Sequence, residues 1–170
     1  RELLLGPARV GAFEVVRRLY VPSGGRYARY IELITNTGAS ALTINVTLSS
    51  NLGSDSATRV VVSPTDTAHR YAVTTEGTSG GDPALAHVFA GTTAALVPVA
   101  TIGSDNLATS WTLTIPAGST AGLMHFAVQR APGDAEAARV QALSLTGGND
   151  PDMFRGIGSE RSLIRNFIIP

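Results

Sequence analysis

The sequence of 170 residues contains no cysteine and no lysine, and its thirteen basic residues are all arginine. Without cysteine, the chain has no disulfide framework and no thiolate ligand for a metal. Without lysine, it has no phosphate-binding loop of the G-x-x-x-x-G-K-[ST] kind. The thirteen acidic residues balance the arginines, whereas a face that binds duplex nucleic acid needs clustered positive charge. We therefore expect no nucleic-acid partner.

Long apolar runs are also missing from the sequence. No segment approaches the roughly 20 consecutive apolar residues that cross a bilayer as a helix, so we expect no membrane insertion. A chain of this length buries close to about 70% of its extended surface on folding, which is enough for a core without disulfide bonds or metals. We predict a single domain over residues 1–170.

Apolar residues alternate with polar residues along much of the chain. In ALTINVTLSS, residues 41–50, every second residue from Leu42 to Leu48 is apolar, which predicts a strand with one buried face and one wet face. SWTLTIP repeats this pattern and places Trp111 in the core. GLMHFAVQR is apolar at most positions and suits a central strand that is covered on both faces. Strands are therefore predicted at 9–21, 27–35, 41–50, 58–63, 69–75, 95–101, 110–116 and 122–130.

The end of the chain has a different character. Asp134 precedes a run of good helix formers, as an N-cap does, and two glycines follow that run. Ser159 similarly precedes Leu163, Ile164 and Phe167, which are apolar residues at helical spacing. We expect this second segment to close one end of the fold. The pattern as a whole is mainly β and predicts an antiparallel β-sandwich, with strands over 1–130 and a short α-helical C-terminal segment within a helical and loop cap over 131–170.

Two passages resemble the Ig-like and fibronectin-like modules of large bacterial secreted or surface proteins. They are ARYIELITNTGASALTINVTL, residues 28–48, and WTLTIPAGSTAGLMHFAVQ, residues 111–129, and each reads as a strand, a glycine turn and a second strand. The resemblance is one of fold pattern. It implies an extracellular or cell-surface location and a connecting or adhesive role beside neighbouring modules of the same parent protein. The chain departs from those modules in its length and its helical tail.

The tripeptide GSD occurs twice, at 53–55 and 103–105. Calcium binds six to eight oxygens from carboxylates, amides and carbonyls, and two such loops that met at one end of a sandwich could supply several of them. Neither loop has the spacing of a dedicated calcium loop, and Asp and Asn are also common in hairpin turns. Structural turns are therefore the favoured interpretation, and calcium as a cofactor is the alternative. The candidate metal ligands are Asn51, Asp55, Asp105 and Asn106.

Tyrosines are the candidate ligand-binding residues, because Trp111 falls on the apolar phase of its strand. Tyr27 and Tyr30 could contact a glycan or a cell-surface ligand, although their spacing places them on opposite faces of one strand. Arg17, Arg18, Arg26 and Arg29 lie near these tyrosines in sequence. We interpret the arginines as belonging to a solvated strand face.

No group of residues in the sequence indicates catalysis. GTSGG, residues 77–81, fits the G-x-S-x-G pattern, but a nucleophile elbow needs a parallel sheet with alternating helices. His69, His87 and His125 are dispersed and lack the paired spacing of zinc hydrolases. We interpret His125 as a packed or surface strand residue.

These observations favour a non-catalytic extracellular structural or adhesive module of a larger bacterial surface or secreted protein. The alternative is a carbohydrate-binding accessory module, with calcium as a stabilising ion. The sequence predicts that the chain is not an enzyme.

Overall fold

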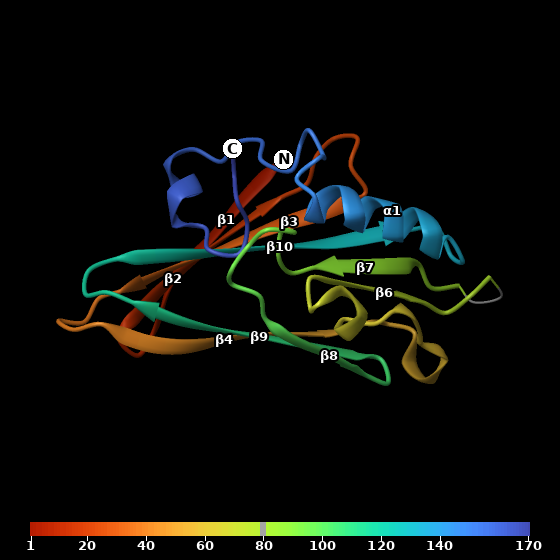
Figure 1. Ribbon diagram of the computed structural model, residues 1–170, viewed down its shortest axis with the longest axis horizontal. Coiled ribbons are helices and arrows are strands. Elements are labelled where there is room, and N and C mark those ends of the chain that lie inside the picture. Colours follow the sequence, from red (N-terminus) through yellow and green to blue (C-terminus); the bar gives the residue numbers. More distant parts are fainter. Residues whose placement is uncertain (79–80) are drawn as a thin grey trace.

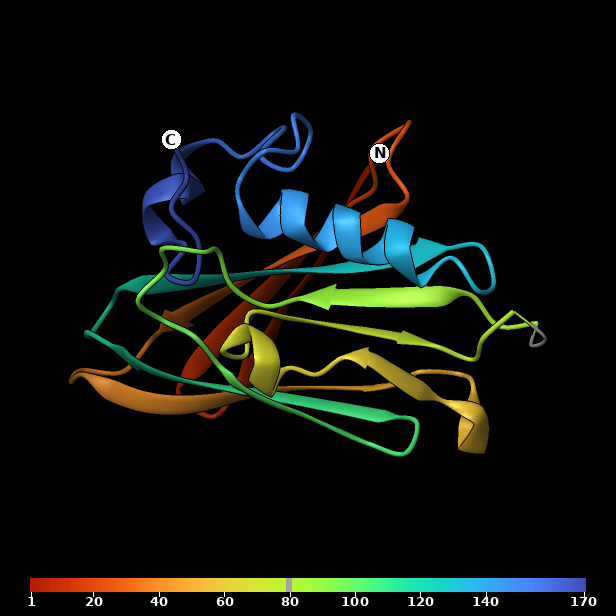
Figure 2. The same ribbon diagram turned by 45° about the vertical axis from the view of Figure 1, so that its right-hand side comes forward.

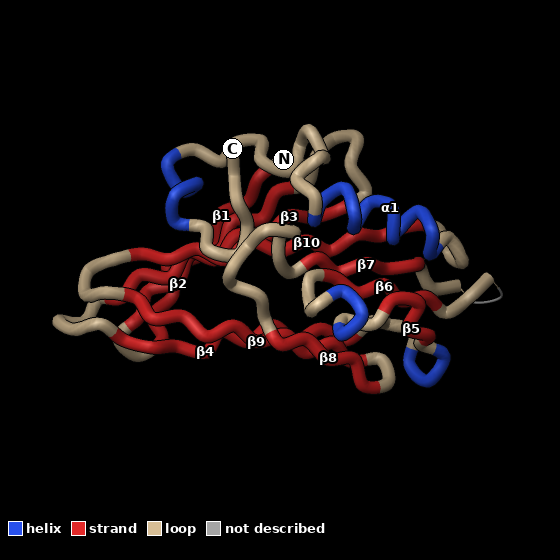
Figure 3. The backbone as a smooth tube through the Cα atoms, viewed as in Figure 1, coloured by secondary structure: helices blue, strands red, loops and turns tan. Residues whose placement is uncertain are grey.

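The computed structural model describes residues 1–78 and 81–170 (Figures 1 and 3). In this part of the chain, a seven-stranded antiparallel sheet with the strand order β1-β2-β3-β10-β7-β6-β5 faces a three-stranded antiparallel sheet with the order β4-β9-β8. The strands are β1 (Glu2–Val10), β2 (Phe13–Tyr20), β3 (Tyr27–Asn36), β4 (Leu42–Asn51), β5 (Arg59–Val62), β6 (Tyr71–Thr75), β7 (Ala84–Val88), β8 (Val99–Gly103), β9 (Asn106–Ile115) and β10 (Thr120–Arg130). The prediction of an antiparallel β-sandwich is confirmed.

The seven-stranded sheet is covered differently on its two faces (Figure 2). Its outer face packs against helix α1 (Ala135–Thr146) and the C-terminal tail, residues 147–170. Its inner face packs against the three-stranded sheet through a second apolar cluster that includes Trp111, Leu123 and Ile34. Because side chains alternate along a strand, β3, β6, β7 and β10 of the large sheet each contribute to both clusters.

The alternation read from the sequence sets the register of the small sheet. Along β4, half-buried residues alternate with exposed ones as predicted, and Trp111, Leu113 and Ile115 of β9 are buried. β10 lies in the middle of the large sheet between β3 and β7, which explains its almost continuous burial. A slip of one residue would turn each of these inner-facing sets toward solvent.

The structure corrects two predicted elements and adds one strand. The strand predicted at 9–21 is the turn and second half of a β1–β2 hairpin, because Gly11 adopts φ +60° and reverses the chain after Val10. Strand β7 was not predicted, since its five residues alternate too briefly to stand out from a loop. The tail segment after Ser159 is a short 3-10 helix, η3 (Ser159–Leu163), in which Ser159 makes no capping bond.

The C-terminal tail covers the outer face of the large sheet rather than one end of the sandwich. Asp134 caps α1 as predicted, because its carboxylate accepts a hydrogen bond from the Ala137 amide. Further along, Ile164 forms a parallel bridge with Gly122 of β10, where a Cβ on the glycine would lie 3.2 Å from the Ile164 side chain. A side chain at residue 122 would therefore push the tail away from the sheet. Among the described residues, no helix is long and apolar enough to span a membrane.

Candidate binding site between the sheets

A cleft opens between the two sheets beside β4, the edge strand of the small sheet, and we call it the inter-sheet cleft. Its volume is about 300 Å³. Its walls are mostly apolar and come from β2, β3, β4, β9 and β10, whereas three charged or titratable side chains lie on the inner face of the large sheet. The residues that line the cleft include Val15, Arg17, Glu32, Ile34, Val46, Leu48, Trp111, Leu123 and His125.

The polar group of the cleft is an ion-pair cluster centred on Glu32. Arg17 is its direct register partner on β2 and donates from Nε to Glu32 Oε1 over 2.8 Å. His125 Nε2 lies 3.2 Å from the same oxygen, and because an ionised carboxylate only accepts, the imidazole donates in this contact. The Glu32 side chain is 9% exposed and that of His125 is 7% exposed, so these two groups are largely desolvated, whereas the Arg17 side chain is 41% exposed.

The second carboxylate oxygen of Glu32 is differently placed. Both neighbours of the carboxylate bind Oε1, and no hydrogen bond to Oε2 exists within the described part of the chain. Oε2 makes no hydrogen bond to any described residue, yet it is not one of the fully buried side-chain atoms without a partner. It is therefore exposed to solvent on the side of the cleft. Glu32 therefore presents a fixed acceptor to whatever enters the cleft, while its charge is balanced by Arg17.

Tyr30 is held in a stack across three strands. Its ring lies parallel to the His125 imidazole, with 4.8 Å between centroids and an interplanar angle of 4°. The Arg17 guanidinium carbon lies 5.7 Å from the centroid of the Tyr30 ring. Because β2 and β10 flank β3 on opposite sides, these neighbours cover opposite faces of the ring. Tyr30 thus offers its hydroxyl and edge to a ligand, and its stacked neighbours fix its orientation.

Two histidines near the cleft are held neutral by burial. Burial lowers the pKa of His125, although the hydrogen bond and negative charge of Glu32 act in the opposite direction. Burial lowers the pKa of His87 to about 4, and the nearby His125 contributes to the shift. Part of the His87 residue is solvent-accessible, but its Nε2 atom is buried and has no hydrogen-bond partner among the described residues.

Other inward-facing polar atoms also lack partners in the described part of the chain. They are Trp111 Nε1 and Thr109 Oγ1, both on β9, and each residue is 1% exposed. The Trp111 ring lies 6.4 Å from that of His125. Buried donors and acceptors of this kind normally bind water or a ligand group, because leaving them unpaired costs about 1–3 kcal/mol each.

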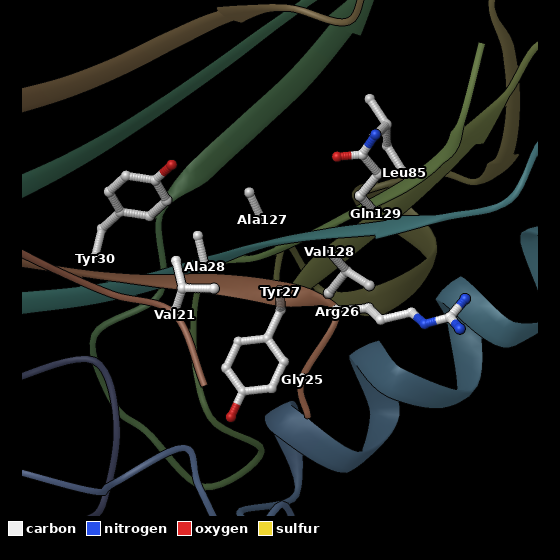
Figure 4. Close-up of a pocket in the computed structure, with 10 residues that line it drawn as sticks. All are labelled: Val21, Gly25, Arg26, Tyr27, Ala28, Tyr30, Leu85, Ala127, Val128 and Gln129. Atoms are coloured by element: carbon white, nitrogen blue, oxygen red, sulfur yellow. The ribbon is translucent and has the colours of Figure 1, made fainter. Parts of the chain in front are cut away.

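The predicted ligand residues Tyr27 and Tyr30 lie on opposite faces of β3, as their spacing requires (Figure 4). Tyr27 faces outward, is 4% exposed and donates its hydroxyl to Asp150 over 2.8 Å. Burial, followed by the hydrogen bond to Asp150, raises the pKa of Tyr27. Its role in the structure is to attach the tail to the sheet. Only Tyr30 of this pair has its side chain on the face that carries the cleft.

Three of the four predicted metal ligands come together at the end of the β4–β9 ladder. Asn51 and Asn106 both donate side-chain hydrogen bonds to the Asp105 carboxylate, and the Asn51 amide oxygen accepts from the Gly53 amide. Asp55 begins the 3-10 helix η1 (Asp55–Ala57), and no hydrogen bond links its side chain to this cluster within the described residues. The oxygens that calcium would need thus bind amide groups instead, and calcium binding stays a prediction.

The sequence did not reveal Arg17, Glu32 and His125 as a group. Arg17 was assigned to a solvated face and His125 to a packed or surface position, and Glu32 was not singled out. Their proximity depends on the pairing of β2 with β3 and of β3 with β10, which the sequence alone does not give. The GTSGG motif cannot be placed either, because residues 79–80 lie outside the described part of the chain.

Comparisons with known proteins find similarity only among solved structures. No protein-family model matches the sequence, and no curated protein matches it. Among solved structures, a proposed aldose 1-epimerase from Klebsiella pneumoniae subsp. pneumoniae matches with a TM-score of 0.49 and 10% sequence identity. The match covers 86% of this chain and 55% of that protein, so this chain spans about half of its length.

This match corrects two expectations. The matched structure is that of a proposed enzyme and not of an Ig-like adhesive module, so the interpretation as a non-catalytic extracellular adhesive module is wrong. The expectation that the chain is not an enzyme is set aside for the same reason. At this identity and TM-score the match transfers no activity to this chain, and the geometry of the cleft must carry any proposal.

Proposed function

We propose that the domain binds carbohydrate in the inter-sheet cleft. The observation that carries the proposal is the Glu32 carboxylate, which is fixed by two neighbours through one oxygen and keeps the other available to a ligand. Hydroxyl groups donate readily to such an oxygen, and a charge-assisted hydrogen bond of this kind is worth about 1.5–3 kcal/mol.

The surroundings of Glu32 suit a saccharide better than a purely apolar ligand or a free anion. Arg17 adds donors beside the carboxylate, and the apolar walls can pack against the C–H faces of a sugar ring. A free anion would meet the negative charge of Glu32. A fully apolar ligand would leave Glu32 desolvated without a new partner, which is unfavourable.

A second candidate function is proton transfer on the bound sugar. It is favoured by the direct contact between the Glu32 carboxylate and the His125 imidazole in a shielded cleft. At a reducing sugar, Glu32 Oε2 would take the proton of the anomeric hydroxyl, whose oxygen becomes the aldehyde oxygen. The bond between C1 and the ring oxygen breaks, and the ring oxygen takes a proton from water. Ring closure on the other face reverses these transfers.

The binding proposal is tested by isothermal titration calorimetry with glucose, galactose and mannose and with their linear oligomers. We expect at least one series to bind, and the Glu32→Gln variant to bind it at least tenfold more weakly. Glu14→Gln is the matched control, because Glu14 lies on β2 with its side chain on the opposite face. Absence of binding across all series, or equal weakening in both variants, would overturn the proposal.

The catalytic candidate is tested separately by following the anomeric signals of freshly dissolved α-glucose and α-galactose by NMR. Acceleration of their equilibration by the wild-type chain, lost in Glu32→Gln and kept in Glu14→Gln, is the expected result. An equilibration rate equal to that in buffer would exclude this activity for these two sugars without affecting the binding proposal.

A further inference from the structure

A second hollow lies against β3 and β10 of the large sheet (Figure 4). We call it the alanine hollow, because the small side chains of Ala28 and Ala127, directly paired across β3 and β10, form its floor. Larger side chains surround this floor, and the volume of the hollow is about 500 Å³. The residues at its rim are Val21, Arg26, Tyr30, Leu85 and Gln129.

The cleft and the hollow are neighbours along the β3–β10 ladder. On the inner face, the cross-strand pairs of β3 and β10 follow one another as Glu32 with Leu123, Tyr30 with His125, and Ala28 with Ala127. Glu32 and His125 line the cleft, and Tyr30 lines the alanine hollow. The stacked pair of Tyr30 and His125 is therefore the boundary between the two, and the Tyr30 hydroxyl lies at that boundary.

The chemistry of the alanine hollow differs from that of the cleft in charge. No acidic side chain lines it, and its polar groups are the exposed side chains of Arg26 and Gln129 together with Tyr30. Its floor and remaining rim are apolar. A surface that alternates apolar patches with hydrogen-bonding groups matches the alternating C–H faces and hydroxyl edges of successive sugar rings.

We propose that the ligand is a linear oligosaccharide that places one sugar ring in the inter-sheet cleft and at least one further ring in the alanine hollow, passing over the edge of Tyr30. This inference rests on the proposed carbohydrate-binding function. It adds that a chain of sugars, and not a single sugar, is the ligand. Two connected hollows with different linings bind a chain more tightly than a single sugar, because the second ring adds contacts once the first is in place.

The test compares chain lengths by calorimetry, using monomer to tetramer of the glucose, galactose and mannose series. For the wild-type protein, we expect the trisaccharide of the bound series to bind at least tenfold more tightly than the monosaccharide. Ala28→Phe fills the floor of the alanine hollow, so it should remove this gain while leaving the affinity for the monosaccharide within about twofold. Ala108→Phe is the matched control, since Ala108 is exposed on β9.

Gln129→Ala is a second variant that keeps the proposal testable if Ala28→Phe does not fold. The Gln129 side chain is exposed, so its truncation should spare the fold and weaken only the longer sugars, by about threefold to tenfold. Equal affinity of wild-type protein for monosaccharide and trisaccharide would overturn the inference and leave the proposed function standing. If no sugar of any length binds, the proposed function itself fails.

Discussion

The two faces of the large sheet use buried polar groups in different ways. On the outer face, Asn166 of the tail donates to the carbonyls of Phe89 and Met124 over 2.6 Å each and accepts from the Met124 amide over 2.9 Å. On the inner face, Glu32 is also buried, yet both of its protein contacts fall on a single oxygen.

The two groups differ in role: Asn166 attaches the tail to the sheet, whereas Glu32 is suited to bind a ligand. A buried polar group whose bonds all go to backbone atoms fixes the fold, and nothing remains to bind a ligand. A buried polar group that is oriented by neighbours but keeps an accessible atom is suited to bind something else. On the outer face the tail covers the sheet (Figure 2). On the inner face, the cleft and the alanine hollow remain beside the three-stranded sheet.

The largest predicted effect is a loss of stability when the tail's attachment to the outer face is removed. Asn166→Leu would leave three buried backbone groups of Phe89 and Met124 without partners, so we expect the free energy of unfolding to fall by about 4 kcal/mol. Chemical denaturation measures the loss. Arg165→Leu, at the exposed neighbouring position, should change stability by less than about 0.5 kcal/mol. Similar losses in the two variants would contradict the assignment of Asn166 as the attachment point.

The next effect concerns pH and the inner face. The pKa of His87 is lowered to about 4 in the folded protein, against about 6.5 when unfolded. The unfolded chain therefore takes up a proton as the pH falls below 6.5, whereas the folded protein does not until the pH reaches about 4. Stability should decline across that window by about 3 kcal/mol from this residue.

Measuring the denaturation midpoint from pH 7 to pH 4 in wild-type protein and in His87→Leu tests this prediction. The variant should lose less stability on acidification, and the remaining slope should contain the contribution of His125, whose pKa is also lowered. Parallel profiles for the two proteins would show that His87 titrates normally in the fold.

A smaller effect is expected at the inner-face carboxylate when no ligand is present. Glu32→Gln keeps an oxygen that can accept from Arg17 and His125, so the free energy of unfolding should change by less than about 1.5 kcal/mol. Binding should change much more than stability. A loss of stability as large as that of Asn166→Leu would instead give Glu32 the same structural role as the groups of the outer face.

The smallest predicted effect lies outside both faces, at the end of the β4–β9 ladder. Asp105→Ala removes two hydrogen bonds from exposed amides, which should lower stability by about 1 kcal/mol. Thermal unfolding with calcium and then with a chelator checks the remaining calcium prediction in the same experiment. A higher midpoint with calcium that is lost in Asp105→Ala would favour a cation site over a structural turn.

Much of the architecture could be predicted because it is encoded locally. The alternation from Leu42 to Leu48 defines β4 in a short window, and Asp134 caps the helix that its own neighbours form. The hairpin at Gly11 was less accessible, because one glycine in an extended pattern does not specify a reversal.

The candidate site could not be predicted because it is encoded by pairing. Arg17 and Glu32 are 15 residues apart, and Glu32 and His125 are 93 residues apart. They meet only because β3 pairs with β2 on one side and with β10 on the other. In the sequence, Arg17 therefore could not be told apart from the other strand arginines. Only the strand pairing shows that Arg17 is the arginine that contacts the buried Glu32 carboxylate.

The measurement that most directly tests the central claim is a ¹⁵N-HSQC titration of the wild-type protein with the tightest-binding oligosaccharide. The account predicts that the largest amide shifts fall along the inner-face ladder, around Ala28, Tyr30, Glu32 and His125, with few changes near Asn166. Shifts centred on the outer face, or on the loops that contain Asp55 and Asp105, would contradict it.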